Sequence, residues 1–405
     1  MRWDAQRLDL DDPAALPGVP AVRGLLRSVE VPEFPGVTLH EVRAKSALNA
    51  VPEASGMPFR WTINPYRGCA HQCTYCFARG THEWLELDSG RDFDTQIVVK
   101  TNLVDVLRRE LARRSWRREH VALGTNTDPY QRAEGRYRLM PGVIRALTAS
   151  GTPFSILTKG TLLRRDLPLL RAAAADVPIG LGVSMAIWDE ELHAALEPGA
   201  PTPRARLELV RAITDAGLPC GVFLAPVLPG LTDRLADLEA ALAAVADAGA
   251  TGVTVLPLHL RPGAREWFTA WLAREHPRLV PHYRRLYGRG AYVPAEYRTW
   301  LTERVAPLLA RHGLGPQSGG AARDGAPAAA DGGPGAPGDE AGGPGAPGDE
   351  AGGPGAPGDE AGGFPAGSLP GAPAPDRRPA ADRRRHLPAA ASGAGSPDAE
   401  QLTLC

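Results

Sequence analysis

The chain has 405 residues, with 45 Lys and Arg against 46 Asp and Glu, and a formal net charge of −1. Residues 313–405 carry 12 acidic and 6 basic side chains, so the remaining part, with 34 acidic and 39 basic, is positive by five. No apolar run reaches the roughly 18 residues of a membrane span, and the first residues lack the apolar core of a signal peptide. We therefore expect a cytoplasmic protein without a membrane partner. Its five cysteines favour metal binding or catalysis over a disulfide framework.

The first part of the chain divides into an irregular lead-in and a region in which predicted strands and helices alternate. In residues 1–57, long helices are prevented by Pro13, Pro17, Pro20, Pro32 and Pro35, which predicts an irregular lead-in with short strands. From 58 to 262, six strand-like runs are expected at 59–64, 121–124, 154–158, 179–184, 220–225 and 252–256. Helical patterns separate them at 103–111, 143–149, 162–174, 204–216 and 235–248. This alternation predicts an α/β fold of parallel strands. A curved, partly closed barrel with its chemistry at the carboxyl ends of the strands is favoured, and a doubly wound sheet is the alternative.

Two further segments follow the predicted barrel. Residues 263–312 form a helical extension rich in aromatic and basic side chains, which either caps the barrel or offers a stacking surface to nucleic acid. Residues 313–405 include 23 Gly and 15 Pro, and the ten-residue sequence at 341–350 is repeated at 351–360. This composition predicts a disordered linker over 313–399, because it cannot bury enough apolar surface to offset chain entropy.

A cysteine motif carries the main functional signal. Cys69, Cys73 and Cys76 stand at the spacing C-x3-C-x2-C directly after the first predicted strand. Three thiolates from one short loop can hold three irons of a [4Fe-4S] cluster and leave the fourth iron open to a substrate or cofactor. The alternative is a zinc site in which His71 supplies the fourth ligand.

The motif resembles that of the radical S-adenosylmethionine (SAM) superfamily, in which an aromatic residue, here Tyr75, precedes the last cysteine. The resemblance implies a partial (β/α)6 barrel, a [4Fe-4S] cluster and SAM as cofactors, and an external electron donor of the flavodoxin or ferredoxin type. It also implies reductive cleavage of SAM to a 5'-deoxyadenosyl radical. Tyr75 would either conduct the radical or only pack beside the cluster.

The order of the later motifs is similar to that of the spore photoproduct lyase-like branch of this superfamily. These motifs lie at 124–131, 156–159, 184, 197–201 and 225–233. The branch resemblance implies that Thr127 and Lys159 contact SAM, Lys159 through the SAM carboxylate. Ser184, Glu197 and Arg206 are further candidate contacts to SAM. The alternatives are a surface lysine at position 159 and a capping or surface ion pair between Glu197 and Arg206.

Two positions depart from the branch pattern. Thr125 stands where spore photoproduct lyases carry a hydrogen-donor cysteine, and Phe77 replaces the tyrosine that follows the last cluster cysteine. We therefore predict a radical SAM enzyme, a lyase or modifying enzyme related to DNA repair, that acts on nucleic acid without reversing thymine dimers. The alternatives are a radical SAM enzyme with a protein or metabolite substrate and a non-catalytic iron–sulfur or zinc adaptor.

Three other features have two interpretations each. His259 and Arg261 are either an ordinary polar exit from the sixth strand or face the substrate. The arginine-rich stretch 108–118 is either a solvated helix end or a phosphate track. The last residues, 400–405, resemble a sliding-clamp binding peptide in which Cys405 replaces the aromatic anchor. Gln401 to Cys405 are therefore either a peptide that binds a sliding clamp or a chance apolar end of the tail.

Overall fold

The computed structural model describes residues 24–32, 34–55, 57–288 and 290–315. The predicted linker at 313–399 lies almost wholly outside these residues, and the predicted clamp peptide at 400–405 lies wholly outside them. Within the described part of the chain, no helix is both long enough and apolar enough to span a membrane.

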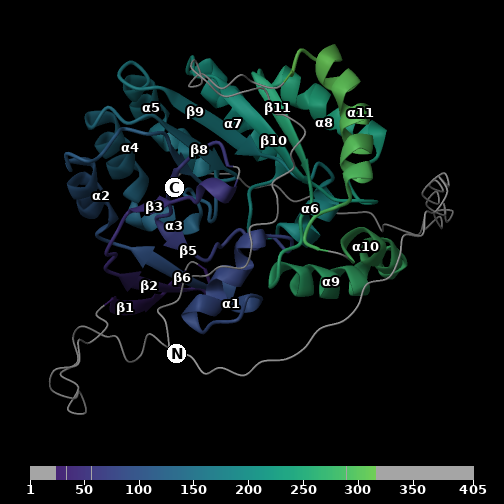
Figure 1. Cartoon of the computed structure of the whole chain (residues 1–405), viewed down its shortest axis with the longest axis horizontal. Helices are drawn as coiled ribbons and strands as arrows, with labels where there is room; N and C mark the ends of the chain where they lie inside the picture. The colour runs from purple at the N-terminus through teal and green to yellow at the C-terminus, as the bar shows by residue number, and fades with distance from the viewer. Residues whose placement is uncertain (1–23, 33, 56, 289, 316–405) are drawn as a thin grey trace, which may run out of the picture. The chain divides into compact units, whose positions relative to one another are not determined.

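The main sheet has seven strands in the order β11-β10-β9-β8-β7-β4-β3 (Figure 1). Six of them are parallel and confirm the six predicted strands, in the order β4 (Trp61–Ile63), β7 (Val121–Leu123), β8 (Phe154–Thr158), β9 (Ile179–Ser184), β10 (Cys220–Val227) and β11 (Gly252–Pro257). The seventh strand, β3 (Leu48–Ala50), pairs antiparallel with β4 at one edge. The predicted α/β class and the open, partial barrel are therefore confirmed.

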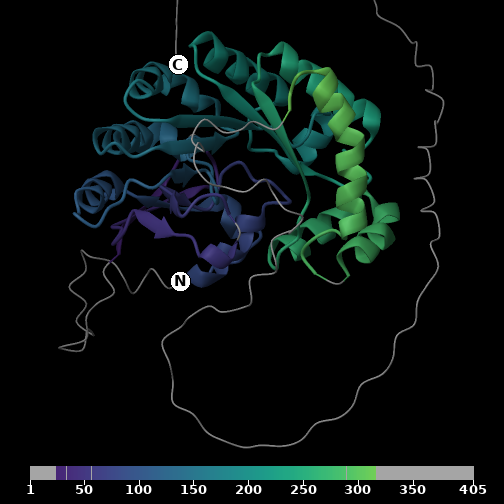
Figure 2. The same cartoon turned by 45° about the horizontal axis from the view of Figure 1, so that its top comes forward.

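Helices cover one face of this sheet, as two views show (Figures 1 and 2). They are α2 (Leu103–Leu111), α4 (Leu139–Ala149), α5 (Leu167–Ala173), α7 (Pro203–Asp215) and α8 (Leu235–Asp247). Each helix buries an apolar stripe against the strands, as Leu103 and Leu107 do in α2. The start of α7 is defined locally, because the Thr202 hydroxyl accepts a hydrogen bond from the Ala205 amide at 3.2 Å and Pro203 opens the helix.

A second sheet of four strands lies beside the first, in the order β1-β2-β6-β5. Its strands are β1 (Leu25–Glu30), β2 (Thr38–Val42), β6 (Gln96–Lys100) and β5 (Tyr66–Arg67). The lead-in thus supplies β1 and β2, and β2 pairs in parallel with β6, a strand that the sequence analysis did not foresee. This sheet matters for the site because β5 ends only two residues before Cys69.

The C-terminal extension consists of α9 (Ala264–Glu275), α10 (Val280–Tyr287) and α11 (Ala295–Arg311). The first two helices bury four aromatic side chains in one apolar cluster, namely Phe268, Trp271, Tyr283 and Tyr287. The α11 helix packs Leu301, Val305 and Leu308 into the main core. Most of the aromatic content of this extension is therefore interior packing, whereas Trp267 and Tyr292 remain partly exposed.

Candidate functional site

The three motif cysteines lie on a loop between β5 and a 3-10 helix, η3 (Phe77–Leu85). The Cys69 amide donates to the Phe93 carbonyl at 3.0 Å, which fixes the start of the loop. Two turns follow, in which the amides of Gln72 and Cys76 donate to the carbonyls of Cys69 and Cys73, each at 3.2 Å. The shape of the loop is thus determined by its own backbone hydrogen bonds and by its contact with Phe93 in the short helix α1 (Arg91–Thr95).

Two buried side chains that the sequence analysis missed hold this loop from outside. Gln131 accepts from the Ala70 amide and donates to the Gly68 carbonyl, both at 3.0 Å. Arg79 donates through Nε and an Nη atom to the Cys73 carbonyl, at 3.1 and 2.9 Å. Gln131 is the last residue of the motif at 124–131, and Arg79 follows Cys76 by three residues. This nearness to the motifs was the one signal that the sequence offered for them.

The predicted motif at 197–201 packs directly on the cysteine loop. The Gly199 amide donates to the His71 carbonyl at 3.2 Å, and a Cβ atom at Gly199 would lie 2.0 Å from the Ala70 carbonyl oxygen. Only glycine permits this close approach of the two backbones. The Thr74 amide also donates to the Leu196 carbonyl at 2.9 Å. These contacts place Glu197 beside the cysteines, although more than 100 residues separate them in sequence.

Cys69 and Cys73 are buried, Cys76 is partly buried, and the three thiols provide a donor set suited to a cluster. Burial raises the pKa of Cys73 well above its usual range and the pKa of Cys76 to about 11. Their thiolate forms therefore need positive charge nearby, as cluster irons would supply. In the described part of the chain, no three His, Cys, Asp or Glu side chains converge closely enough to bind one metal ion. A [4Fe-4S] cluster takes each thiolate on a different iron, so its ligands need not converge on one point.

Five of the six predicted non-cysteine site residues form one hydrogen-bonded network. The Tyr75 hydroxyl donates to Oε1 of Glu197, and an Nη atom of Arg206 pairs with Oε2 of the same carboxylate. The Lys159 ammonium lies 3.3 Å from Glu197 Oε1 and donates to the Ser184 hydroxyl at 2.7 Å. A second Nη atom of Arg206 donates to the Ser184 carbonyl at 3.0 Å. The structure thus brings together side chains from four separate segments of the chain.

Glu197 is the anionic centre of this network. Burial by itself would raise the pKa of Glu197, but Arg206 and Lys159 outweigh it and hold the pKa well below its usual range. His193 adds a third basic side chain, with Nε2 3.4 Å from Glu197 Oε2. Glu197 and Arg206 are fully buried, whereas the Lys159 side chain is 12% exposed. The predicted alternative of a surface ion pair between Glu197 and Arg206 is therefore wrong.

The sixth predicted residue, Thr127, lies outside this network. Its hydroxyl donates to the Tyr66 carbonyl at 2.8 Å, so it supports the strand that leads into the cysteine loop. The neighbouring Asp128 accepts from the Thr158 hydroxyl and the Lys159 amide, both at 2.6 Å, and thereby fixes the backbone at Lys159.

His71 faces Asp128, with Nδ1 3.4 Å from Oδ2. Burial would lower the pKa of His71, but the charges of Asp128 and Cys69 raise it to about 10. Nδ1 of His71 is therefore paired with a carboxylate of the chain itself.

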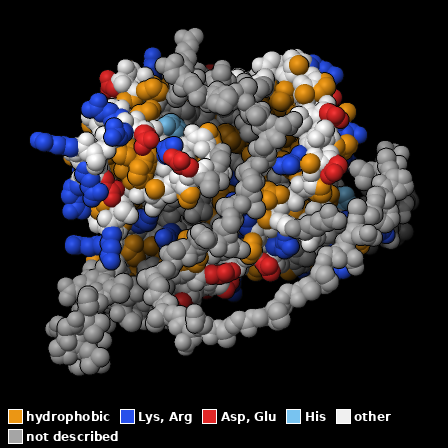
Figure 3. All heavy atoms as spheres, viewed as in Figure 1, with side chains coloured by type: hydrophobic (Ala, Val, Ile, Leu, Met, Phe, Trp, Pro, Cys, Tyr) orange, Lys and Arg blue, Asp and Glu red, His pale blue; other side chains and the backbone are white. Residues whose placement is uncertain are grey.

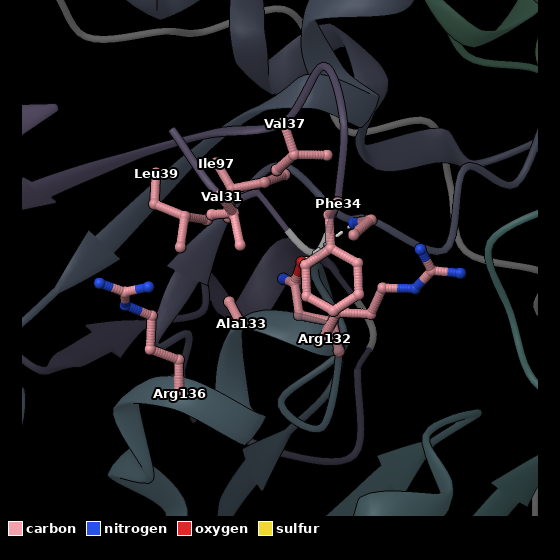
Figure 4. Close-up of a pocket in the computed structure, with 10 residues that line it drawn as sticks. Val31, Phe34, Val37, Leu39, Ile97, Arg132, Ala133 and Arg136 are labelled. Atoms are coloured by element: carbon pink, nitrogen blue, oxygen red, sulfur yellow. Dashed lines mark hydrogen bonds between the residues drawn. The ribbon is translucent and has the colours of Figure 1, made fainter. Parts of the chain in front are cut away.

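A small apolar pocket lies behind Ala70 of the cysteine loop (Figure 4). Val31, Phe34, Val37 and Ile97 line it, and the Arg132 guanidinium lies 5.0 Å from the centre of the Phe34 ring. Its volume of about 20 Å³ holds roughly one water molecule, so it is a packing gap and not a substrate cavity.

The thiol pattern around the site differs from that expected for a thiol hydrogen donor. Outside the motif, the described residues include one cysteine, Cys220. It lies at the amino end of β10, whereas the motif loop lies on the side of the carboxyl ends of the strands. Burial raises the pKa of Cys220 to about 12, which identifies it as an inert core thiol. Cys405 lies outside the described residues.

Comparison with known proteins assigns the chain to a family. The family model described as the Radical SAM superfamily matches residues 63–242. The chain is 61% identical over 318 residues to uncharacterized protein Rv2578c of Mycobacterium tuberculosis, which covers 78% of this chain and 93% of that protein. The chain belongs to the radical SAM superfamily. Radical SAM proteins typically use a [4Fe-4S] cluster and SAM, and the cysteine loop matches that usage in its donor set.

Two more distant similarities were found, one to a protein sequence and one to a solved structure. Uncharacterized protein MJ0683 of Methanocaldococcus jannaschii is 24% identical over 199 residues, covering 49% of this chain and 70% of that protein. Among solved structures, spore photoproduct lyase complexed with dinucleoside spore photoproduct matches with a TM-score of 0.51 and 15% identity. That match covers 68% of this chain and 79% of the lyase chain. It confirms that the fold is like that of the spore photoproduct lyase branch.

Proposed function

We propose that this protein is a radical SAM enzyme that binds a [4Fe-4S] cluster through Cys69, Cys73 and Cys76 and binds SAM next to it. The observation that carries the proposal is the network of Tyr75, Lys159, Ser184, Glu197 and Arg206 packed against the cysteine loop. When bound, the reduced cluster and SAM supply a 5'-deoxyadenosyl radical that abstracts a hydrogen atom from the substrate.

The network divides into residues that contact SAM and residues that position them. The Lys159 ammonium has three donors, and two polar partners among the described residues, Ser184 and Glu197. Its third donor and its partial exposure suit it to bind the SAM carboxylate. Glu197 and Arg206 are fully buried, so they act as positioning residues that orient Lys159 and Ser184.

The proposed substrate is nucleic acid, modified by hydrogen abstraction in a repair-type or modification reaction. The positive balance of residues 1–312 supports this class of substrate, since a polyanion is attracted to a basic protein. The lyase with the similar fold has been solved with a dinucleoside photoproduct. Thymine-dimer reversal is not proposed, because Thr125 cannot return a hydrogen atom as a thiol does. The reaction also requires a one-electron donor of the flavodoxin or ferredoxin type.

The test is SAM cleavage by the reconstituted full-length protein. Under anaerobic conditions, with iron, sulfide, dithionite and SAM, the wild type is expected to produce 5'-deoxyadenosine, with single-stranded DNA present as candidate substrate. Cys76→Ala should abolish the product, whereas Cys220→Ala, which removes the core thiol, should retain it. If the cluster forms but calorimetry detects no SAM binding to the wild type, the enzyme proposal is wrong and the iron–sulfur adaptor is favoured.

A further inference from the structure

Three aromatic rings lie in a row directly beside the last motif cysteine. Phe77 follows Cys76 in sequence, His259 follows β11, and Tyr292 lies just before α11. The ring centres of Phe77 and His259 are 5.4 Å apart, and those of His259 and Tyr292 are 5.7 Å apart. We call these three residues the aromatic row. None of them takes part in the network around Glu197.

One arginine lies across the aromatic row. The Arg261 guanidinium is 5.7 Å from the centre of the Phe77 ring, and its Nη atom donates to the Tyr292 hydroxyl at 3.3 Å. Arg261 is exposed, and Phe77 and Tyr292 are each 36% exposed, which is unusual for large aromatic side chains of the described part. The surface beside the cysteine loop therefore offers two partly exposed rings and one cation.

The segments that carry the aromatic row are fixed relative to one another. The Leu260 amide donates to the Ala291 carbonyl at 2.7 Å, which ties the exit of β11 to the segment before α11. The loop at Gly263 packs on η3 so closely that a Cβ atom there would lie 2.9 Å from the Gly80 Cα atom. The rings thus form a rigid surface, and little conformational entropy is lost when a ligand binds to it.

The middle ring of the row is uncharged at neutral pH. Burial, with a smaller contribution from Arg261, lowers the pKa of His259 to about 4. The row therefore presents aromatic faces with a single formal charge, that of Arg261. Such a surface suits a ligand that alternates planar bases with phosphates, since bases stack on rings and a phosphate pairs with a guanidinium.

We propose that the aromatic row and Arg261 bind a single-stranded nucleic-acid segment, with bases stacked on Phe77 and Tyr292 and a phosphate on Arg261. This inference rests on the proposed function and names the residues that would deliver a nucleic-acid substrate to the cluster. A protein electron donor is the competing ligand. The observations favour nucleic acid, because a docked acidic protein would call for several cations, and here one arginine accompanies two partly exposed rings.

The basic side chains that gather over α2 and α4 offer a control region (Figure 3). The arginine-rich stretch 108–118 ends just before β7 begins, at the amino end of that strand. Phe77 and Arg261 instead follow the carboxyl ends of strands. Arg117 is exposed there, so it serves as an arginine of similar exposure remote from the aromatic row.

The experiment measures binding of a fluorescein-labelled single-stranded DNA to the anaerobically reconstituted full chain by fluorescence anisotropy. Loss of one stacked base is worth about 1–3 kcal/mol, so Phe77→Leu and Tyr292→Leu should each weaken binding by about 5-fold to 150-fold. Tyr292→Phe keeps the ring and should bind nearly as the wild type does. Arg261→Gln should weaken binding and lower the slope of log affinity against log salt by about 1, whereas Arg117→Gln should change neither.

Two outcomes would overturn the inference. Equal DNA affinity of the wild type, Phe77→Leu and Arg261→Gln, with active SAM cleavage by the wild type, would refute the DNA-binding role and leave the proposed function intact. Unchanged DNA binding together with slower turnover from reduced flavodoxin, but not from dithionite, would assign the aromatic row to the electron donor. Conversely, DNA binding that depends on the row in a protein that never binds SAM would refute the proposed function alone.

Discussion

Two buried groups of charges contact the cysteine loop, one at the Cys73 carbonyl and one at the Tyr75 hydroxyl, and they differ in the donors they leave available to a ligand. The first joins Arg79 to Asp94, and the second joins Glu197 to Arg206 and Lys159. Both groups bury charged side chains, whose removal from water would be costly without a partner of opposite charge. The comparison shows which of the two is equipped to bind a ligand.

Arg79 is saturated by the chain itself. Its guanidinium donates to both oxygens of Asp94 at 2.9 and 3.1 Å, to the Cys73 carbonyl, and to the Gly90 carbonyl at 2.7 Å. The rings of Phe93 and Trp267 lie 5.2 and 5.1 Å from it. No donor of Arg79 is left for a ligand, so this group serves the shape of the loop.

The second group keeps one cation partly open. Each of the three guanidinium nitrogens of Arg206 donates within the chain, to Glu197 and to the carbonyls of Ser184 and Pro201, and the side chain is fully buried. Lys159 is anchored by Ser184 and Glu197, and its side chain is still partly exposed. The lesson is that burial of a charge does not identify a functional site, whereas an anchored charge with a spare donor points to one.

The largest expected effect follows from removing the saturated cation. Arg79→Met leaves Asp94 and several carbonyls without a buried partner, so the free energy of unfolding should fall by about 3–5 kcal/mol. Arg27→Met is the matched control: Arg27 pairs with Glu41 but is 64% exposed, and its loss should cost about 1 kcal/mol or less. Anaerobic urea unfolding measures both variants, and equal losses would contradict the distinction.

Removing the partly open cation should affect ligand binding more than stability. Lys159→Met deletes one charge-assisted hydrogen bond to SAM, worth about 1.5–3 kcal/mol, so the dissociation constant for SAM should rise by about 10-fold to 150-fold. Stability should fall less than in Arg79→Met, because Arg206 still neutralises Glu197. Calorimetric titration of the reconstituted protein with SAM checks this, and Lys45→Met, at an exposed lysine, is the control. Unchanged SAM affinity in Lys159→Met would remove Lys159 from the site.

The barrel could be predicted because each of its buried parallel strands is a short apolar run between helical patterns. Strands β5 and β6 could not, since β5 has two residues and β6 pairs with β2, a strand more than 50 residues earlier. Their stability comes from tertiary pairing, which leaves no periodic pattern in sequence.

The cysteines and the members of the Glu197 network were foreseen because they occupy spaced motifs. Their mutual contacts were not, since nothing in the sequence states that Gly199 touches Ala70. Arg79, Asp94 and Gln131 were missed for a related reason. Gln131 and Arg79 bond to backbone groups of the loop, and Asp94 pairs with Arg79. Such contacts require no fixed spacing between residue types.

The smallest expected effect is a pH dependence that separates the two groups. Burial raises the pKa of Asp94 to about 6, although Arg79 opposes it, whereas the pKa of Glu197 is held well below its usual range. A carboxyl group with a raised pKa in the folded state binds more protons there than in the unfolded chain. Its contribution to stability therefore increases as the pH falls through 6 and is lost as the pH rises.

Asp94→Asn removes this titration. With an unfolded pKa near 3.9, the stability of the wild type relative to the variant should increase by about 1 kcal/mol between pH 7.5 and pH 5.5. Urea unfolding of both proteins at the two pH values measures the difference, and groups that titrate in both cancel. A difference close to zero would mean that Arg79 outweighs burial and keeps Asp94 ionised over this pH range. Asp94 and Glu197 would then both stay ionised over this pH range, and the two groups would differ only in the spare donor of Lys159.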